Sequence, residues 1–263
     1  MTSTSKRILI TGAGSGIGRD SARALAERGH TVHATTHSEE QAAAWRSAGL
    51  AGVDAFKLDI TDAGDRARIA ELPIDVLINN AAIGQSGSLA EVPLERIRAT
   101  FETNLFATLA LTQIALKPMI SRRRGRIVFI SSLVGRIPAP FLMPYSMTKF
   151  ALSAAADALR QELARLDCGV DVALVEPGAF HTGFNQRMLA TKYEWMREGS
   201  YFEDQMLQLK QEELRQLAVL EVASTGSIVR QIVRAVEAHK PRARYVAPWW
   251  QGFGVRLLRA FGK

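Results

Sequence analysis

Tyr145 and Lys149 have the side-chain types and the spacing of a proton-transfer pair. The pattern of residues 144–167 predicts a helix, on which side chains at i and i+4 share one face about 6 Å apart along the axis. A free tyrosine has a pKa of about 10 and is a poor base at neutral pH. A neighbouring ammonium group stabilises the phenolate, so the sequence predicts a lowered pKa for Tyr145.

Ser132 adds a hydroxyl group to this pair. It follows Ser131 at the carboxyl end of an apolar run, residues 126–131, that predicts a buried strand. A serine hydroxyl beside the pair can hold a substrate oxygen while the tyrosine exchanges its proton with that oxygen. A Tyr-x-x-x-Lys pair alone is most often an ordinary pair on a helix surface. The catalytic interpretation therefore also depends on a glycine-rich turn near the N-terminus.

Four glycines stand on alternate residues between an apolar run and a predicted helix: Gly12, Gly14, Gly16 and Gly18. Neither the G-x-G-x-x-G dinucleotide fingerprint nor the P-loop pattern fits them. Two patterns do fit, the G-x-G-x-G loop of S-adenosylmethionine-dependent methyltransferases and T-G-x-x-x-G-x-G beginning at Thr11. A strand, a glycine-rich turn and a helix in this order can hold a pyrophosphate against the helix N-terminus, where backbone N–H groups and the helix dipole favour negative charge. The methyltransferase pattern also requires an acidic residue at the end of the second strand, and the chain has none there.

Strand-length apolar runs alternate with helix-period segments along the chain, which predicts a parallel sheet covered by helices on both faces. The expected fold is a single α/β domain over residues 1–263, a doubly wound (Rossmann-type) three-layer sandwich with a mainly parallel sheet of about seven strands. The predicted strands lie at 7–11, 31–35, 53–58, 75–79, 126–131, 170–175 and 244–247. The predicted helices lie near 17–28, 39–48, 63–70, 93–121, 144–167 and 224–239.

The sequence motifs over residues 7–182, and their order along the chain, resemble those of the short-chain dehydrogenase/reductase family. The matching residues are Thr11, Gly12, Gly16 and Gly18 in the turn, Asp59-Ile60, Asn79-Asn80-Ala81, Asn104, Ser132, Tyr145, Lys149, Pro177-Gly178 and Thr182. Ala82 stands where the family more often has glycine. Beyond Thr182 the resemblance thins to general architecture, so it says little about the substrate.

The resemblance implies an oxidoreductase that interconverts a ketone or aldehyde and an alcohol by hydride transfer with NAD(P). Tyr145 would be the general acid in reduction and the base in oxidation, Lys149 would lower its pKa and bind the nicotinamide ribose, and Ser132 would polarise the carbonyl. Asn104 would support the lysine through a water molecule. The implied cofactor-binding residues are Gly12, Ser15, Gly16, Ile17, Gly18, Thr36, His37, Asp59, Ile60, Asn80, Ala81, Tyr145, Lys149, Pro177, Gly178 and Thr182. A catalytically silent dinucleotide-binding regulator and a methyltransferase remain as alternatives.

A preference for NADP(H), with NAD(H) still accepted, is expected from the end of the second strand. An NAD-selective site would place Asp or Glu near Thr36 to bind the ribose hydroxyls, and that carboxylate would repel a 2′-phosphate. The chain instead offers hydroxyls at Ser15, Thr36 and Ser38, and His37, a side chain that is only partly charged at neutral pH. The expected preference is therefore modest and grows as the pH falls.

The formal net charge of +7 is concentrated in residues 238–263, which hold six Lys and Arg residues and no acid. The arginines at 122–126 are interpreted as a solvated turn, because no aromatic residues alternate with them as in nucleic-acid sites. The single cysteine excludes an internal disulfide, and the five scattered histidines predict no metal site. With no predicted signal peptide or membrane span, a cytoplasmic location is expected.

Residues 180–222 interrupt the regular alternation and predict a lid over the carboxyl ends of the strands. Seven apolar or aromatic side chains in this segment are candidates to line a substrate pocket: Phe180, Phe184, Met188, Tyr193, Trp195, Met196 and Phe202. They suggest a fairly large apolar carbonyl compound or alcohol as substrate. The alternative is that they only pack the lid against the body of the protein. Residues 248–263 predict a basic amphipathic tail, whose part from 249 would contact a membrane surface weakly, a partner subunit or the body of the protein. Small residues in the helices at 101–121 and 144–167 favour close packing, and the corresponding helices of the family form homodimers or homotetramers.

Overall fold

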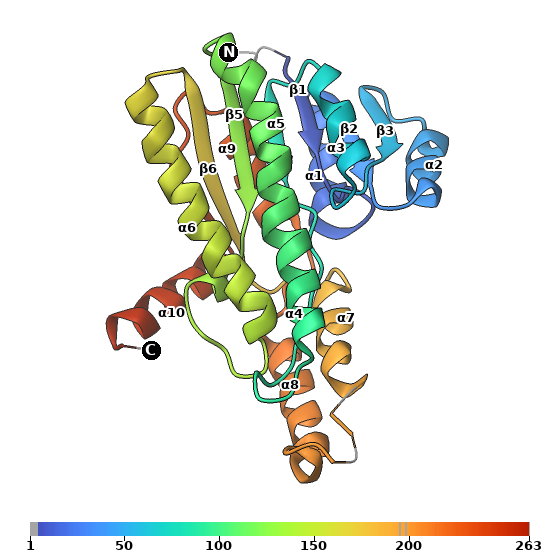
Figure 1. Cartoon of the computed structure of the whole chain (residues 1–263), viewed down its shortest axis with the longest axis vertical. Helices are drawn as coiled ribbons and strands as arrows, with labels where there is room; N and C mark the ends of the chain where they lie inside the picture. The colour runs from blue at the N-terminus through green and yellow to red at the C-terminus, as the bar shows by residue number, and fades with distance from the viewer. Residues whose placement is uncertain (1–4, 195, 198, 263) are drawn as a thin grey trace.

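The computed structural model describes residues 5–194, 196–197 and 199–262 (Figure 1). The strands are β1 (Arg7–Ile10), β2 (Thr31–Thr36), β3 (Val53–Lys57), β4 (Val76–Asn79), β5 (Gly125–Ile130), β6 (Val170–Pro177) and β7 (Arg244–Ala247). The helices are α1 (Gly16–Glu27), α2 (Glu39–Ala48), α3 (Ala63–Arg68), α4 (Leu94–Phe101), α5 (Thr108–Ser121), α6 (Met143–Leu166), α7 (Phe184–Ala190), α8 (Met206–Leu220), α9 (Gly226–Glu237) and α10 (Trp249–Ala260).

The seven strands form one parallel sheet in the order β3-β2-β1-β4-β5-β6-β7. β1 pairs with β2 on one side and with β4 on the other, so the direction of winding reverses beside it. In doubly wound folds, ligands bind in the crevice at the carboxyl ends of the strands beside this reversal. All the predicted strands are present, with ends displaced by two residues at most, and the predicted fold class is confirmed.

Two hydrophobic clusters, one on each face of the sheet, make up the core. Ile8 and Ile10 of β1 pack in one cluster with α1 and α9, whereas Leu9 lies in the other with α5 and α6. Successive side chains of a strand point to opposite faces, so a sheet covered on both sides needs apolar residues throughout its strands. This is why the inner strands β1, β4, β5 and β6 appear in the sequence as mostly apolar runs.

The arginines at 122–126 are largely used within the fold. Arg126 is buried, donates to two backbone carbonyls at the end of α9, and pairs with Asp171. Arg123 pairs with Asp167. Part of the positive charge of this turn is therefore neutralised by the protein itself.

Helices α7, α8 and α10 lie beyond the carboxyl ends of the strands (Figure 1). The segment at 180–222 forms α7, short 3₁₀ turns and α8, and it is closed at its base by an isolated bridge between Phe180 and Val222. None of the residues of α8 is fully buried. Among the described residues, no helix combines the length and apolar character that crossing a bilayer would need.

Candidate active site

A cavity of about 1010 Å³ lies at the carboxyl ends of the strands. Its wall combines the turns after the first six strands with parts of α6, α7, α8 and α10. The sequence-predicted residues that line it are Gly12, Ser15, Gly16, Ile17, Gly18, His37, Asp59, Ile60, Asn80, Ala81, Ser132, Tyr145, Lys149, Pro177, Gly178 and Thr182. The structure therefore brings most of the predicted site together, although these residues come from distant parts of the sequence.

The turn after β1 is held against the residues that follow β4. The Thr11 hydroxyl oxygen accepts hydrogen bonds from the backbone N–H groups of Asn80 and Ala81, both at 3.0 Å. The Asn80 side-chain amide donates to the carbonyls of Thr11 and Gly12 at 2.9 and 3.1 Å. Gly12 has a φ of +67°, and a β-carbon there would lie 2.8 Å from the Ala81 Cα. Only glycine fits this position without a shift of the backbone.

The start of α1 has the form of an anion-binding site. Ser15 stands at the N-cap position and makes no side-chain capping bond, so the first N–H groups of the helix are not capped by it. Gly16 has a φ of +54°, and a β-carbon there would lie 3.0 Å from the Thr182 Cβ. A β-carbon at Gly18 would collide with the backbone of the same turn. Ser15, Gly16 and Gly18 thus form a cradle at the start of α1 with room for a pyrophosphate against the helix N-terminus. The residues therefore fit a dinucleotide cofactor.

Gly14 has a different neighbour from the other three glycines. A β-carbon there would meet the end of the Gln41 side chain, which reaches the turn from α2. Gln41 also lines the cavity, and sequence reasoning missed it. Its only sequence signal was its place in the first turn of the helix after β2.

The end of β2 differs in part from the prediction. Thr36 is fully buried and its hydroxyl donates to the Ser38 carbonyl at 2.8 Å, so it does not reach the cavity. The His37 side chain is 82% exposed and its Nδ1 lies 3.8 Å from the Asp59 carboxylate. Hydrogen bonds from Thr61 hold the pKa of Asp59 below its usual value, so this carboxyl group is ionised at neutral pH. Of the two predicted residues at the end of this strand, His37 therefore lines the cavity and Thr36 does not.

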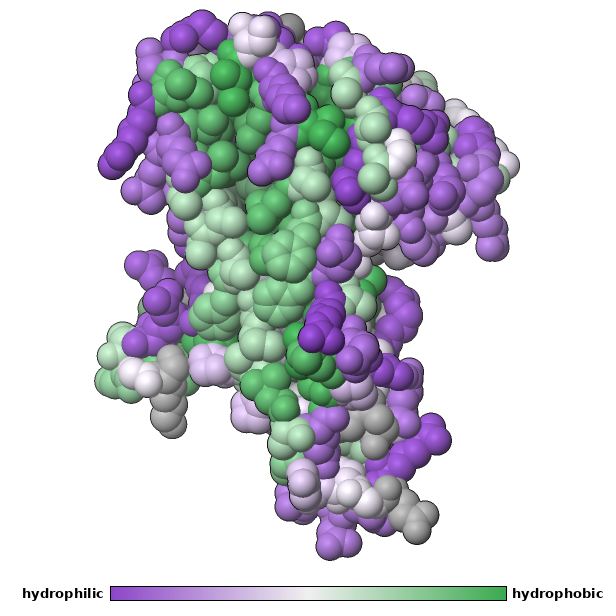
Figure 2. All heavy atoms as spheres, in the orientation of Figure 1, coloured by the Kyte–Doolittle hydropathy of each residue, from purple (hydrophilic) through white to green (hydrophobic). Residues whose placement is uncertain are grey.

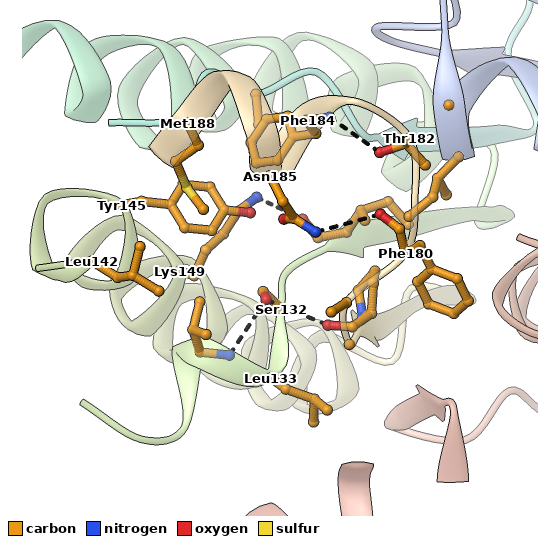
Figure 3. Close-up of a pocket in the computed structure, with 18 of the residues that line it drawn as sticks. Ser132, Leu133, Leu142, Tyr145, Lys149, Phe180, Thr182, Phe184, Asn185 and Met188 are labelled. Carbon is orange, nitrogen blue, oxygen red and sulfur yellow. Dashed lines mark hydrogen bonds between the residues drawn. The ribbon is translucent and has the colours of Figure 1, made fainter. Parts of the chain in front are cut away.

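Tyr145 and Lys149 lie in the first turns of α6, are both buried, and face the cavity together (Figure 3). The Lys149 ammonium donates to the Ile130 carbonyl at 2.9 Å and lies 5.5 Å from the centre of the tyrosine ring. Burial lowers the pKa of Lys149 to about 8 and raises the pKa of Tyr145, because each charged form loses hydration. The direction for Tyr145 is opposite to the one predicted from the neighbouring ammonium, since desolvation outweighs the effect of that charge.

Ser132 follows β5 and begins a short 3₁₀ turn at Leu133–Gly135. Its hydroxyl oxygen accepts from the Val134 N–H at 3.3 Å and donates to the Pro177 carbonyl at 3.4 Å. The donated bond is longer than the usual O–H···O range, so it is weak and easily exchanged for another acceptor. The Ser132 hydroxyl is therefore available to an oxygen bound in the cavity.

Asn104 does not line the cavity but lies behind it, in a π-helical segment (Glu102–Ala107) between α4 and α5. Its amide oxygen accepts from the Ile83 N–H at 2.8 Å, and its amide nitrogen donates to the Ile83 carbonyl at 2.9 Å and to the Thr148 hydroxyl at 3.1 Å. Thr148 directly precedes Lys149 on α6. Asn104 thus links the loop after β4 to the helix that carries the Tyr–Lys pair, and π-helical segments are frequent at functional sites.

The apolar residues of the segment at 180–222 divide into two groups. Those that line the cavity are Phe180, Phe184 and Met188, and Trp195 lies outside the described residues. Those that do not line it are Tyr193, Met196 and Phe202, and the Phe202 ring packs edge-on against Phe141 in the loop before α6. The ring of Phe184 lies 5.5 Å from that of Tyr145, so α7 covers the phenol directly (Figure 3).

Sequence reasoning missed the walls that α8 and α10 contribute. The residues are Leu209, Glu212, Glu213, Gln216, Leu217 and Leu220 from α8, and Trp250, Gln251, Gly254, Val255 and Leu258 from α10. The Gln251 side chain accepts from the Ala179 N–H at 2.8 Å and donates to the Leu220 carbonyl at 2.7 Å. It thereby joins α10 to the segment after β6 and to the end of α8. The predicted amphipathic tail was present in the sequence pattern, but the pattern did not show which part of the protein it contacts.

A family profile described as short chain dehydrogenase matches residues 6–192. The chain belongs to the short chain dehydrogenase family. This short chain dehydrogenase is 38% identical over 187 residues to the ketoacyl reductase HetN of Nostoc sp., in an alignment that covers 67% of the chain. The chain spans only 64% of the length of HetN, less than two thirds of that relative.

Two further relatives align with most of this short chain dehydrogenase. It is 30% identical over 252 residues to the NADPH-dependent 3-dehydrocapnine reductase of Ornithobacterium rhinotracheale, with 90% of the chain and 86% of that protein covered. A solved short-chain dehydrogenase from Streptomyces avermitilis matches with a TM-score of 0.80 and 29% identity, over 98% of this chain and 95% of the other. The family profile stops before α8 and α10, so these walls of the cavity lie outside the part that the profile describes.

Proposed function

We propose that this short chain dehydrogenase is an NADP(H)-preferring oxidoreductase that interconverts a ketone or aldehyde and an alcohol by hydride transfer. The observation that carries the proposal is that Ser132, Tyr145 and Lys149 line the same cavity as the glycine cradle of α1. When bound, the nicotinamide supplies or takes up the hydride. The intact Tyr–Lys pair argues against a silent regulator, and the end of β2 without a carboxylate argues against a methyltransferase.

Each of the three side chains has a distinct proposed role. In reduction, the Tyr145 hydroxyl donates its proton to the carbonyl oxygen, and in oxidation the phenolate takes it back. The raised pKa of Tyr145 supports the first role, because the phenol stays protonated at neutral pH. Ser132 donates a hydrogen bond to the same substrate oxygen and so orients the carbonyl. The Lys149 ammonium binds the ribose of the nicotinamide half.

Asn104 is proposed as a positioning residue, because its side chain does not reach the cavity. Its bonds to both backbone groups of Ile83 and to Thr148 fix the spacing between the loop after β4 and the first turns of α6. This spacing sets where Lys149 lies relative to the cofactor cradle. The water-mediated support implied by the family resemblance would act from the same place.

The preference for NADP(H) is supported by the exposed His37 and by the absence of an acidic side chain at the end of β2. The relative from Ornithobacterium is named as NADPH-dependent. We expect kcat/KM to be a few-fold higher for NADPH than for NADH at neutral pH. The His37→Arg variant should raise the ratio further, because a guanidinium binds phosphate more strongly. A preference of the wild-type protein for NADH would contradict this proposal.

A fairly large apolar carbonyl compound or alcohol is the proposed substrate class. Leu142, Phe184 and Met188 line the cavity beside Tyr145, and Trp250 and Leu258 extend its apolar wall. The curated relatives are named as reductases of a ketoacyl group and of 3-dehydrocapnine. Initial rates with carbonyl compounds of graded size and polarity test the class directly, and equal rates for small polar ketones would contradict it.

The pH dependence of reduction should follow Lys149. Burial lowers its pKa to about 8, so the ammonium form is present below that pH and is lost as the pH rises through it. Because the proposed ribose contact needs the ammonium, kcat/KM for NADPH should be flat at lower pH and fall above about pH 8, by up to about tenfold per unit. Steady-state rates measured from about pH 6 to 10 check this. A profile that stays flat across the range would contradict the proposed contact between the Lys149 ammonium and the ribose.

We propose that residues 1–263 form one cofactor-binding domain with a lid at 180–222, and that two or four copies associate. Figure 2 shows apolar residues gathered on the face over α5 and α6. Phe106, just before α5, and Phe150 of α6 are 55% and 37% exposed, and Ala154 and Ala158 of α6 are exposed as well. Burying such a face in a symmetric contact removes apolar surface from water. Light scattering should show a dimer or tetramer, and a 28.8 kDa monomer would contradict the proposal.

A further inference from the structure

Helix α10 packs on the body along one side only. Gly252 and Val255 are buried, and a β-carbon at Gly252 would press on the Val246 side chain of β7. Gln251 adds its two hydrogen bonds to Ala179 and Leu220 on the same side. These contacts fix the orientation of the helix, which stands out from the body on the side away from α7 (Figure 1).

The opposite side of α10 presents large apolar side chains to the surroundings. Trp249, Phe253 and Leu257 are spaced at i, i+4 and i+8 and therefore share one face. Their exposed fractions are 78%, 56% and 45%, and Phe261 continues the row with 80% exposed. Single exposed apolar residues are normal, but a row of four, three of them aromatic, marks a contact surface.

Positive charge lies beside this face. Arg256 and Arg259 lie on α10 itself. Within the described part of the chain, neither of these side chains forms an ion pair, and residues 238–263 contain no acid. The surface is therefore apolar in its middle and cationic at its edge.

We propose that α10 docks this protein on an anionic lipid surface, with Trp249, Phe253, Leu257 and Phe261 inserted at the boundary between headgroups and acyl chains. A helix with an apolar face and Lys or Arg beside it binds such a surface through both effects. A second copy of the chain fits less well, because a two-fold contact through α10 would bring the same uncompensated arginines together. Charge complementarity therefore favours an anionic membrane.

The placement of α10 also connects the proposed membrane contact with the cavity. Trp250, Gly254 and Leu258 lie on the neighbouring side of the helix and line the cavity, so the apolar face and the cavity wall share one helix. An apolar molecule dissolved in the lipid would enter the cavity beside these residues without crossing water. This second step rests on the proposed function, whereas the docking itself does not.

Flotation of the full chain with vesicles tests the docking independently of any activity. The wild-type protein should float with vesicles that contain phosphatidylglycerol and stay at the bottom with phosphatidylcholine alone. The double variant Phe253→Glu, Leu257→Glu should bind the anionic vesicles at least about tenfold more weakly, because it loses apolar area and adds negative charge.

A matched control is the double variant Leu207→Glu, Leu214→Glu on α8, whose side chains are 73% and 56% exposed and do not line the cavity. It should float as the wild-type does, and thermal melting should show all three proteins folded. Wild-type protein that does not float with anionic vesicles overturns the proposal, as does equal loss of flotation in the two variants. Unchanged flotation of the α10 variant together with a smaller oligomer in light scattering would assign the face to a second copy instead.

Discussion

Replacing Tyr145 with phenylalanine is expected to lower kcat for carbonyl reduction by about 10²- to 10⁴-fold while NADPH binding stays nearly unchanged. The variant keeps the ring that packs against Phe184 at 5.5 Å and loses only the hydroxyl, and hence the transferable proton. The cavity therefore keeps its shape, and the barrier to proton transfer rises. Steady-state kinetics give kcat, and the fluorescence of bound NADPH gives the cofactor affinity.

Tyr193→Phe is the matched control for this experiment. The Tyr193 hydroxyl donates to Glu213 at 2.6 Å within the lid, and its side chain does not line the cavity. Loss of this hydroxyl removes one partly exposed hydrogen bond, so kcat should stay within about threefold of the wild-type value. If Tyr145→Phe retained more than about a tenth of the wild-type kcat, or if both variants fell alike, Tyr145 would not be the proton donor.

Replacing Gly18 with alanine is expected to weaken NADPH binding at least about tenfold, which corresponds to about 1.4 kcal/mol. The new methyl group would collide with the Gly12 carbonyl oxygen and the Asn80 amide. The Gly12 carbonyl is part of the backbone, and the Asn80 amide is held by two hydrogen bonds, so neither group can move aside easily. The start of α1 must therefore move away from the residues after β4. Fluorescence titration measures the affinity, and thermal melting separates lost binding from lost stability.

The same substitution at Gly14 provides the comparison. A methyl group there would meet only the end of the Gln41 side chain, which is exposed and can turn aside. Gly14→Ala should therefore bind NADPH within about threefold of the wild-type protein. Equal losses in the two variants would show that the cradle does not distinguish these glycines, and the assignment of Gly18 to the pyrophosphate site would be wrong.

The strands and the Tyr–Lys helix could be predicted because local pattern and environment agree. The inner strands β1, β4, β5 and β6 are buried on both faces, so their runs are mostly apolar. The i, i+4 spacing of Tyr145 and Lys149 places them together on any helix. Thr36 could not be judged from its type, because whether a hydroxyl faces a cavity or its own backbone depends on the local turn. The pKa of Tyr145 could not be judged either, since burial is a property of the folded chain.

The walls from α8 and α10 show a different limit. Leu258 stands in the predicted amphipathic tail, but such a pattern does not name the surface that its apolar side contacts. Leu217 stands in the segment at 180–222, for which the sequence predicted a lid but not the position of α8. Gln251 carries no pattern at all, and its role follows from two hydrogen bonds that exist only after α10 has packed. The cofactor half of the site is therefore predictable from motifs, whereas the substrate half depends on tertiary packing.

The position of α10 near the C-terminus also determines when the cavity is completed during protein synthesis. A chain leaves the ribosome from its N-terminus, and early segments begin to fold first. The sheet up to β6 and the segment at 180–222 are translated before Trp250, Gly254 and Leu258, which line the cavity, and before Gln251, which ties Ala179 to Leu220. A nascent chain stalled before α10 therefore lacks this wall of the cavity, and translation of this helix is what completes it.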